Sequence, residues 1–420
     1  MQYYFFHHGI PISRKSENFR QIWFPLSDDI NTVLEYIRNH HKEAVHFSLE
    51  KSFQSFIKPS TDVQFFEPLQ TEEKPVKKIL FFAQSDTLAH SCWLMGERLK
   101  SQIQVLYSVP KLKKERSDVF FSQKGIAYTE FSVKILKSFR PDVVVLLNDW
   151  SKQPQWLISL CRLHKIPVIC MQESVIDFGD RFKRMQWADE VMIQGTQTLF
   201  DLNREVYYLT GNPRYESLSL LQSNKRDSIL INSNFTYGIF EEVRNSWIQD
   251  VTECAKKIDS PYFISQHPRD KGDLSAFRQV IRSSSMQVAD QLTKAWCVVT
   301  RFSSLIHEAL VAGVPVIYYN PHGEKMQYDF GFNNEFLLLA TNKDELENAL
   351  KKANSFSNRE KIQDYLVNHC IQKENRPVEN ILQLFTQLKF KSRAFSINDA
   401  WKLIIYHPSL LRLIWFLKKR

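Results

Sequence analysis

The sequence predicts an α/β protein made of two Rossmann-like domains that face each other across a cleft, the GT-B type. Three observations lead to this prediction. The chain has 420 residues, more than one ordinary hydrophobic core accommodates. Short apolar runs alternate with helical segments from residue 77 onward, which is typical of a parallel, doubly wound sheet. A polar stretch at 219–227 interrupts the alternation, and the pattern then begins again.

Residues 1–76 precede the alternation and are interpreted as an extension packed on the first domain. They hold a predicted helix at 28–44, the histidine pair of "FHHG", which we expect to be packed, and a charged connector at 67–78. The first domain, 77–218, is interpreted as the acceptor-side domain. Its expected strands are 77–84, 141–148, 166–173, 189–196 and 206–213, with helices at 87–102 and 158–165.

The second domain, 219–388, is expected to bind a nucleotide sugar. Its predicted strands are 228–235, 261–266, 297–302, 314–320 and 336–341, with helices at 239–258, 303–313 and 343–355. In open α/β sheets, ligands bind outside the carboxyl ends of the strands. The residues that follow each strand are therefore the candidates for a site.

Composition narrows the kind of protein. The six cysteines are far apart and form no CxxC pair, which indicates buried free thiols in a reducing compartment. The start of the chain lacks the basic and long apolar regions of a signal peptide, and no run reaches the length of a membrane span. We therefore expect a cytoplasmic protein.

Charge is concentrated at the end of the chain. The net charge is +9, and residues 389–420 hold eight basic residues and one acidic residue, which leaves +2 for the first 388. A nearly neutral body argues against nucleic acid as a partner. The basic, amphipathic tail suits either an anionic membrane surface, here the cytoplasmic face of the inner membrane, or docking on another domain, including a further glycosyltransferase domain.

The stretch "RFSSLIHEALVAGVPVIYYN" (301–320) is the strongest local signal. Glycine is scarce, with 11 residues and no GxGxxG or GxxxxGK[ST], so a nucleotide site must use other donors. Ser303 and Ser304 fall where a strand gives way to a helix, a natural phosphate site. Glu308 follows about one turn later and could accept from ribose hydroxyls, unless these residues serve only as helix cap and surface.

The stretch "YFISQHPRD" (262–270) supplies a second strand end. Pro268 fixes its own φ and donates no amide hydrogen, so the strand ends there and aims His267. We expect this strand end to adjoin that of Ser303 and Ser304, so that His267 reaches the same phosphate and Arg269 adds charge. A structural histidine is the plain alternative.

The pairing of "QHP" with "RFSSLIHEALVAGVPVI" resembles the nucleotide-sugar half of GT-B glycosyltransferases that build bacterial surface polysaccharides. "VICMQESVIDFG", "QWADEVMIQGT" and "LTGNPRYESL" in the first half add to the likeness, which covers roughly residues 77–355. The pattern is most similar to the retaining β-Kdo transferases, which take Kdo from CMP-Kdo for capsule, O-antigen or lipopolysaccharide synthesis.

This resemblance implies how a donor would be held. His267, Ser303 and Ser304 would bind the CMP phosphate, and Glu308 the ribose. Such donors need no bound metal and no further cofactor, and no DxD motif appears among the strand-end residues. Arg301, Arg269 and Arg214 are candidates for the Kdo carboxylate. The residues expected to contact the donor are Gln266, His267, Pro268, Arg269, Arg301, Ser303, Ser304, Glu308 and Asn320.

Catalysis also needs a carboxylate, as base or as nucleophile. Glu173 directly follows a buried strand and is the first choice, Asp177 the second and Asp149 the third. A retaining enzyme of this family is expected to present an Asp where this chain has Asn232. An amide cannot serve as that nucleophile, so turnover could be impaired, and Asn232→Asp is expected to raise transferase activity.

Three other readings stay open. A sugar-nucleotide 2-epimerase shares the two-domain fold and a similar Ser-Ser helix, but would need no acceptor. A glycerophosphotransferase that uses CDP-glycerol carries related motifs. A non-catalytic nucleotide-sugar-binding module is kept open by Asn232. The sequence leaves the glycan acceptor, the donor's base and sugar, and the oligomeric state undecided.

Overall fold

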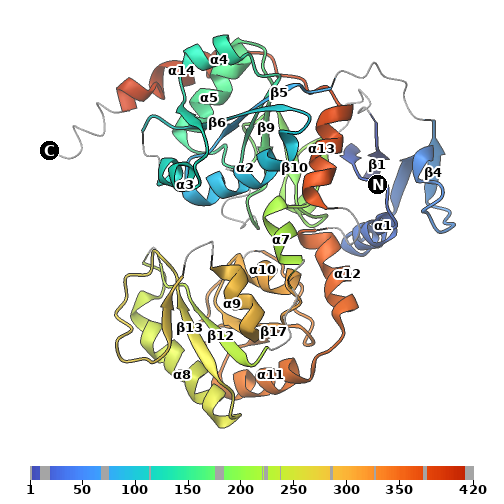
Figure 1. Ribbon diagram of the computed structural model, residues 1–420. Helices are drawn as coiled ribbons and strands as arrows, with labels where there is room; N and C mark the ends of the chain where they lie inside the picture. Colours follow the sequence, from blue (N-terminus) through green and yellow to red (C-terminus); the bar gives the residue numbers. More distant parts are fainter. Residues whose placement is uncertain are drawn as a thin grey trace. The chain divides into compact units, whose positions relative to one another are not determined.

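The computed structural model describes residues 2–9, 19–67, 75–112, 115–175, 184–219, 221, 226–236, 238–283, 287–325, 328–371 and 376–411. The chain divides into two compact units (Figure 1). The first comprises Met1–Arg214 with Val367–Arg420, and the second comprises Tyr215–Leu366. Within the described ranges, every helix is too short or too polar to cross a membrane.

The first unit is built on one sheet of eleven parallel strands in the order β4-β3-β1-β2-β11-β10-β9-β8-β5-β6-β7. The strands are β1 (Gln2–His7), β2 (Phe19–Trp23), β3 (Val45–Glu50), β4 (Val63–Phe66), β5 (Lys78–Phe82), β6 (Gln104–Val109), β7 (Tyr128–Glu130), β8 (Val143–Leu146), β9 (Val168–Met171), β10 (Glu190–Ile193) and β11 (Val206–Leu209). The extension thus contributes four strands, and β2 joins it to the rest by pairing with β11.

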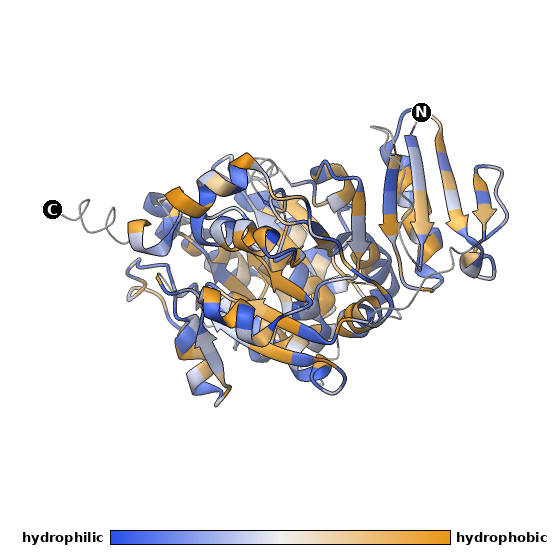
Figure 2. Cartoon of the chain, turned by 90° about the horizontal axis from the view of Figure 1, so that it is seen from above, coloured by the Kyte–Doolittle hydropathy of each residue, from blue (hydrophilic) through white to orange (hydrophobic). Residues whose placement is uncertain are grey.

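Alternate residues of these strands face two separate cores. On β5, Leu80 and Phe82 belong to one buried cluster, while Ile79 and Phe81 belong to the other. The first cluster takes in α1 (Asp29–His40) and α5 (Lys152–Leu163), and the second takes in α2 (Asp86–Leu99) and α13 (Pro377–Gln387). Hydrophobic residues, orange in Figure 2, run along the strands because both faces of the sheet are covered.

Further helices complete the first unit. They are α3 (Ser117–Gln123), α4 (Val133–Phe139), α6 (Thr198–Asp201) and α14 (Ile397–Ile405), with short 3₁₀ turns at Lys51–Phe53 and Pro213–Tyr215. The sequence placed domain ends at residues 218 and 388, whereas the units divide after Arg214 and Leu366. The second division comes earlier because Ile381, Leu384 and Phe385 of α13 pack in a core of the first unit.

The second unit has a six-stranded parallel sheet in the order β14-β13-β12-β15-β16-β17. Its strands are β12 (Ser228–Ser233), β13 (Tyr262–Gln266), β14 (Val280–Arg282), β15 (Ala295–Thr300), β16 (Val316–Tyr319) and β17 (Leu337–Ala340). The helices are α7 (Glu216–Ser219), α8 (Arg244–Lys257), α9 (Val288–Lys294), α10 (Leu305–Val311), α11 (Lys343–Ser355) and α12 (Arg359–His369), with a 3₁₀ turn at Glu241–Val243. The α/β class with two parallel sheets, predicted from the sequence, is confirmed.

Candidate functional site

The second unit has a topological switch point between β12 and β15. The chain runs from β12 outward to β13 and β14, then returns to the other side of β12 and continues through β15, β16 and β17. In such sheets the loops diverge at the carboxyl ends of the two central strands and leave room for a ligand. The residues after β12 and β15 are therefore the best-placed candidates in this unit.

The strand order corrects one expectation. The sequence placed His267 and the Ser303–Ser304 pair at adjoining strand ends, but β12 lies between β13 and β15. Two strand spacings separate their strand ends by about 10 Å. The expectation failed because β15 follows β13 as the next long strand in the chain but pairs with β12. His267 and Ser303 thus flank the switch point from two sides.

The loop after β13 holds His267 in a defined orientation. Its backbone amide donates to the carbonyl of Ser233 on β12 at 2.9 Å. Its ring nitrogen Nδ1 accepts from the amide of Arg269 at 3.2 Å, so the neutral ring carries its hydrogen on Nε2. Burial and, to a lesser degree, Arg269 lower the pKa of this half-buried histidine. His267 is therefore a neutral hydrogen-bond donor at neutral pH.

Buried contacts fix the rest of this loop. Asp270 accepts from Ser233 Oγ at 2.9 Å and from Gly272 N at 2.9 Å, and it pairs with Arg244 Nε at 2.9 Å. A Cβ atom at Gly272 would come within 2.4 Å of the Arg244 guanidinium, so any other residue there would displace this side chain. Gln266 Nε2 donates to the carbonyls of Asp270 and Gly272. Gln266 thus braces the loop, while Pro268 and Arg269 are exposed.

The start of α10 brings Ser303, Ser304 and Glu308 together. Ser303 Oγ accepts from the amide of Leu305 at 3.2 Å, and both serines are half-buried. Ser304 Oγ donates to Glu308 Oε1 at 3.4 Å. Glu308 is 3% exposed, so it is more deeply buried than expected for a residue that contacts a ribose at the protein surface. Its predicted role stays a prediction.

Arg301 is held within its own unit by a cluster that the sequence did not reveal. Its Nη2 lies 2.5 Å from Glu324 Oε1, and its Nη1 donates to the carbonyls of Asn234 and Ile239. Tyr318 Oη donates to Glu324 Oε2 at 2.9 Å. Asn320 Oδ1 accepts a hydrogen bond from the Glu324 amide, and Asn320 Nδ2 donates to the Glu324 carbonyl. These two bonds fix the turn.

This cluster changes the expected role of Arg301. Its guanidinium is buried at 5% exposure, lies 4.4 Å from the centre of the Phe235 ring and already has a carboxylate partner. The carboxylate of a sugar would have to compete with Glu324 for it. The sequence signal for Glu324 was slight: an acid four residues after Asn320, in a turn with proline and glycine.

Asn232 lies within β12 with its side chain in the sheet interior. It is 6% exposed, and its Nδ2 donates to Thr300 Oγ1 of the neighbouring β15 at 2.8 Å. The Thr300 hydroxyl in turn donates to the carbonyl of Arg301 at 2.8 Å. In this chain Asn232 therefore joins the two central strands just below their carboxyl ends.

In the first unit, Glu173 follows β9 at the carboxyl edge of the large sheet. It is half-buried and lines a small hollow with Asn148, Trp150 and Arg184. Asn212 Nδ2 donates to the Glu173 carbonyl at 3.1 Å and fixes the backbone there. A buried amide network lies behind it, in which Gln172 Oε1 accepts from the Gln194 amide and the Thr198 hydroxyl.

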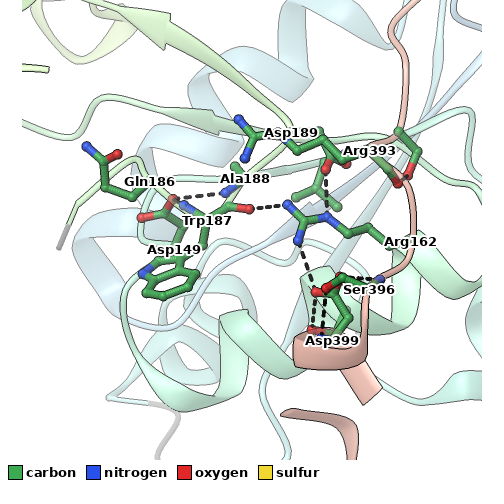
Figure 3. A network of polar contacts seen from close by, with 12 residues as sticks. Asp149, Arg162, Gln186, Trp187, Ala188, Asp189, Arg393, Ser396 and Asp399 are labelled. Carbon is green, nitrogen blue, oxygen red and sulfur yellow. Dashed lines mark hydrogen bonds and ion pairs between the residues drawn. The ribbon is translucent and has the colours of Figure 1, made fainter. Parts of the chain in front are cut away.

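Asp149 lies near this hollow but has a different environment from Glu173. Its carboxylate accepts hydrogen bonds from the amides of Met185, Trp187 and Ala188 at 2.6, 2.8 and 3.1 Å (Figure 3). Burial raises its pKa, although these amides and Arg204 oppose the shift. Asp149 thus clamps a loop and is fully buried.

The two remaining candidates of the first unit are placed differently. Asp177 lies outside the described residues. Arg214 follows β11, and its charge contributes to the low pKa of His90, which burial chiefly lowers to about 4. Across the residues that the structure describes, His, Cys, Asp and Glu side chains form no group of three or more placed to hold a metal ion.

Comparisons with known proteins bear on the fold. No known protein family and no curated sequence matches the chain. Many solved structures are similar to the chain, and the following three are among them. A putative UDP-N-acetylglucosamine 2-epimerase from Listeria monocytogenes has a TM-score of 0.56 at 12% identity, covering 76% of this chain and 99% of that one. The UDP-GlcNAc 2-epimerase from Neisseria meningitidis bound to UDP-GlcNAc has 0.51 at 14%, covering 73% and 97%. Acinetobacter baumannii MurG has 0.50 at 13%, covering 74% and 100%.

At these identities the likeness shows the fold. The chain has two parallel-sheet units, and its fold is GT-B-like, similar to that of the 2-epimerases and MurG. The narrower resemblance to β-Kdo transferases finds no counterpart among these structures. Donor, acceptor and reaction are therefore matters of proposal.

Proposed function

We propose that the chain is an enzyme of nucleotide sugars that binds the nucleotide at the β12/β15 switch point of its second unit. The observation that carries this is the placing of Ser303 and Ser304 at that switch point, with His267 one strand beyond β12. The serine hydroxyls and backbone amides suit phosphate oxygens. The Nε2–H of His267 makes no hydrogen bond with another described residue and could donate to a phosphate or base carbonyl.

The first candidate reaction is 2-epimerisation of the sugar while it belongs to a nucleotide sugar. It is supported by the likeness of the fold to several 2-epimerases, one of them bound to UDP-GlcNAc. Inversion at C2 requires a C2–H bond to break and re-form, which a carboxylate acting as acid and base can assist. Glu173, the first choice of carboxylate from the sequence, follows β9 of the first unit and is proposed for this role.

The second candidate is transfer of the sugar to a bacterial surface-glycan acceptor, with Kdo from CMP-Kdo as the donor that the sequence motifs favour. MurG, whose fold is also similar, and the "QHP" and "RFSSLIHEAL" motifs support this candidate. Two further alternatives use the same nucleotide site: transfer from a CDP-glycerol donor, and nucleotide-sugar binding without catalysis. A cytoplasmic location, with contact to the inner membrane, is part of this proposal.

Binding and turnover distinguish these possibilities. Titration of the full chain with UDP, CMP and CDP-glycerol, followed by thermal shift, identifies the base. Stabilisation by none of them would overturn the proposed site. Incubation with a nucleotide sugar in D₂O, monitored by NMR, detects 2-epimerisation as deuterium at C2 without any acceptor. Nucleotide release that requires a glycan acceptor would instead identify a transferase.

A further inference from the structure

Helix α14 attaches to the first unit by a side that holds Asp399, Lys402 and the partly buried Leu403, and it turns four other apolar residues outward. Asp399 and Lys402 are buried, at 1% and 8% exposure. Ile397, Trp401, Ile404 and Ile405 are 81%, 59%, 63% and 46% exposed, and their spacing puts them on one side of the helix. We call these four residues the outer face of α14. Surface helices ordinarily bury such a face, so its exposure calls for an explanation.

Buried polar contacts hold α14 in this orientation. Asp399 Oδ1 accepts from Arg162 Nη1 at 3.0 Å and from Ser159 Oγ at 2.9 Å, both on α5 (Figure 3). Its Oδ2 and the Ser396 hydroxyl form a capping box at the start of α14. Lys402 Nζ lies 3.7 Å from the centre of the Trp187 ring. Arg162 is itself paired with Asp189, so the anchor reaches into the unit.

Arg162 and Ser159 fix which side of α14 faces the protein. Rotating the helix to bury its outer face would expose Asp399 and leave the buried Arg162 with less compensation, which is costly. The apolar face is thus exposed because the buried contacts of Asp399 fix the orientation of the helix. A covering partner therefore has to come from outside the described residues.

The segment that leads into α14 is basic. Lys389, Lys391 and Arg393 are exposed there, and Arg393 lies close enough to Asp189 and Glu190 to interact with both. Asp399 is the only acidic residue in the sequence of residues 389–420 and of α5, and its charge is paired with Arg162. Residues 412–420, which lie outside the described ranges, add four basic residues in sequence. An exposed apolar strip that is preceded and followed in sequence by a net excess of basic residues is complementary to a negatively charged, partly apolar surface.

We propose that the outer face of α14 binds the surface of an anionic phospholipid membrane. Ile397, Ile404 and Ile405 would enter the boundary between headgroups and acyl chains, and Trp401 would lie at headgroup level. The lysines and arginine before the helix would lie near lipid phosphates. Four side chains on a nine-residue helix offer much less than the roughly 800 Å² per partner of a stable protein interface, which favours the membrane over a protein.

The test uses the full chain and vesicles. Flotation is measured with phosphatidylcholine vesicles and with vesicles of phosphatidylcholine and phosphatidylglycerol in equal parts. We expect binding to the anionic vesicles that weakens as salt is raised. The variant Trp401→Gln/Ile404→Gln should lower the vesicle-bound to free ratio about tenfold, because two exposed apolar side chains no longer insert. Ile281→Gln/Leu339→Gln removes apolar residues of 40% exposure each from the second unit and should bind as the unaltered chain does.

Several outcomes would overturn the proposal. These are absence of binding to anionic vesicles, equal binding to both vesicle types, and equal loss in the control variant. If Trp401→Gln/Ile404→Gln leaves vesicle binding unchanged, the membrane-binding surface lies elsewhere in the chain, for example in residues 412–420. A dimer in sedimentation that this variant dissociates, without vesicle binding, would identify a second copy as the partner. Because the proposal does not involve the nucleotide site, nucleotide-induced thermal shifts should be unchanged in both variants, which separates the two proposals.

Discussion

Arg301 Nη2 and Glu324 Oε1 lie 2.5 Å apart in the second unit, with the arginine 5% exposed. The ion pair joins the loop after β15 to the turn after β16, and Tyr318 Oη adds a hydrogen bond to the same carboxylate. It therefore sets the loop geometry beside Ser303. A residue that sequence reasoning assigns to ligand binding can thus have its charge satisfied within the protein.

Removing Glu324 is expected to be costly for stability. Glu324→Ala leaves the buried Arg301 without its carboxylate and should lower the free energy of unfolding by about 3 kcal/mol. Glu335→Ala is the matched control, because its ion pair with Lys361 is about half exposed and such pairs contribute under about 1 kcal/mol. Urea unfolding of both variants measures the difference. Equal losses would mean that the Arg301 pair stabilises no more than a surface pair.

His267→Ala should weaken nucleotide binding without unfolding the chain. The ring supplies one neutral donor, and a hydrogen bond of this kind is worth about 1 kcal/mol, or about a fivefold change in the dissociation constant. The loop should persist, because the backbone amide of residue 267 still donates to Ser233. Calorimetric titration with the best-binding nucleotide measures the effect. His164→Ala changes an exposed histidine of the first unit and should bind normally. Unchanged affinity in His267→Ala would make this histidine structural only.

Much of the fold can be predicted from the sequence, because continuous apolar runs such as Val143–Leu146 identify buried parallel strands. The order of strands in the sheet cannot be predicted this way. β2 pairs with β11, some 180 residues along the chain, and nothing in the local pattern of either strand indicates that partner. β3 did carry an alternating signal, since Val45, Phe47 and Leu49 are buried, but His46 and Ser48 between them leave no continuous apolar run.

The candidate site shows the same limit. Residues at strand ends were identified correctly as strand ends, including His267, Asn320 and Glu173. Which of them adjoin depends on the strand order, so the pairing of His267 with Ser303 was misplaced by one strand. The internal partners of Arg301 and Asp149 come from loops whose course no sequence pattern specifies.

The hydrogen bonds of Asn232 reverse the expectation drawn from the sequence: Asn232→Asp should destabilise the second unit and leave any turnover unimproved. The amide donates to Thr300 Oγ1, whose hydrogen is directed at the Arg301 carbonyl. The Thr300 hydroxyl has one hydrogen, so it could donate to a carboxylate only by giving up the Arg301 carbonyl, and the loss of either contact costs about 1–3 kcal/mol. Asn342→Asp makes the same chemical change at the start of α11, where the side chain accepts from the Glu345 amide, and should be tolerated. Thermal melts and activity assays decide. Raised turnover with unchanged stability would favour a nucleophile position instead.

Acid should destabilise the chain through buried histidines. Burial lowers the pKa of His307 to about 3 and that of His7 to about 4, from the usual 6.5. The unfolded chain takes up these protons as pH falls below 6.5, whereas the folded chain does not until it nears those lower values. Stability is thus full above 6.5 and should fall by up to about 2 kcal/mol per histidine at pH 5.

Measurements of unfolding free energy between about pH 5 and about pH 7.5, a range that spans the pKa of an unfolded histidine, test this dependence. In His307→Gln, which cannot titrate, the slope below pH 6.5 should be smaller by about one proton. An identical slope in His307→Gln would show that this histidine does not contribute.

Asp399→Asn should loosen α14 and destabilise the first unit. Although burial opposes the charged form, hydrogen bonds from Ser396 and the nearby Arg162 keep the pKa of Asp399 below its usual range, so the native contact is ionic. The amide retains the shape but removes the charge facing Arg162, which then relies on Asp189 alone. We expect a loss of about 2 kcal/mol and faster hydrogen exchange in Ile397–Ile405. If exchange in this helix is unchanged, the ion pair does not hold it, and the orientation of its outer face must have another cause.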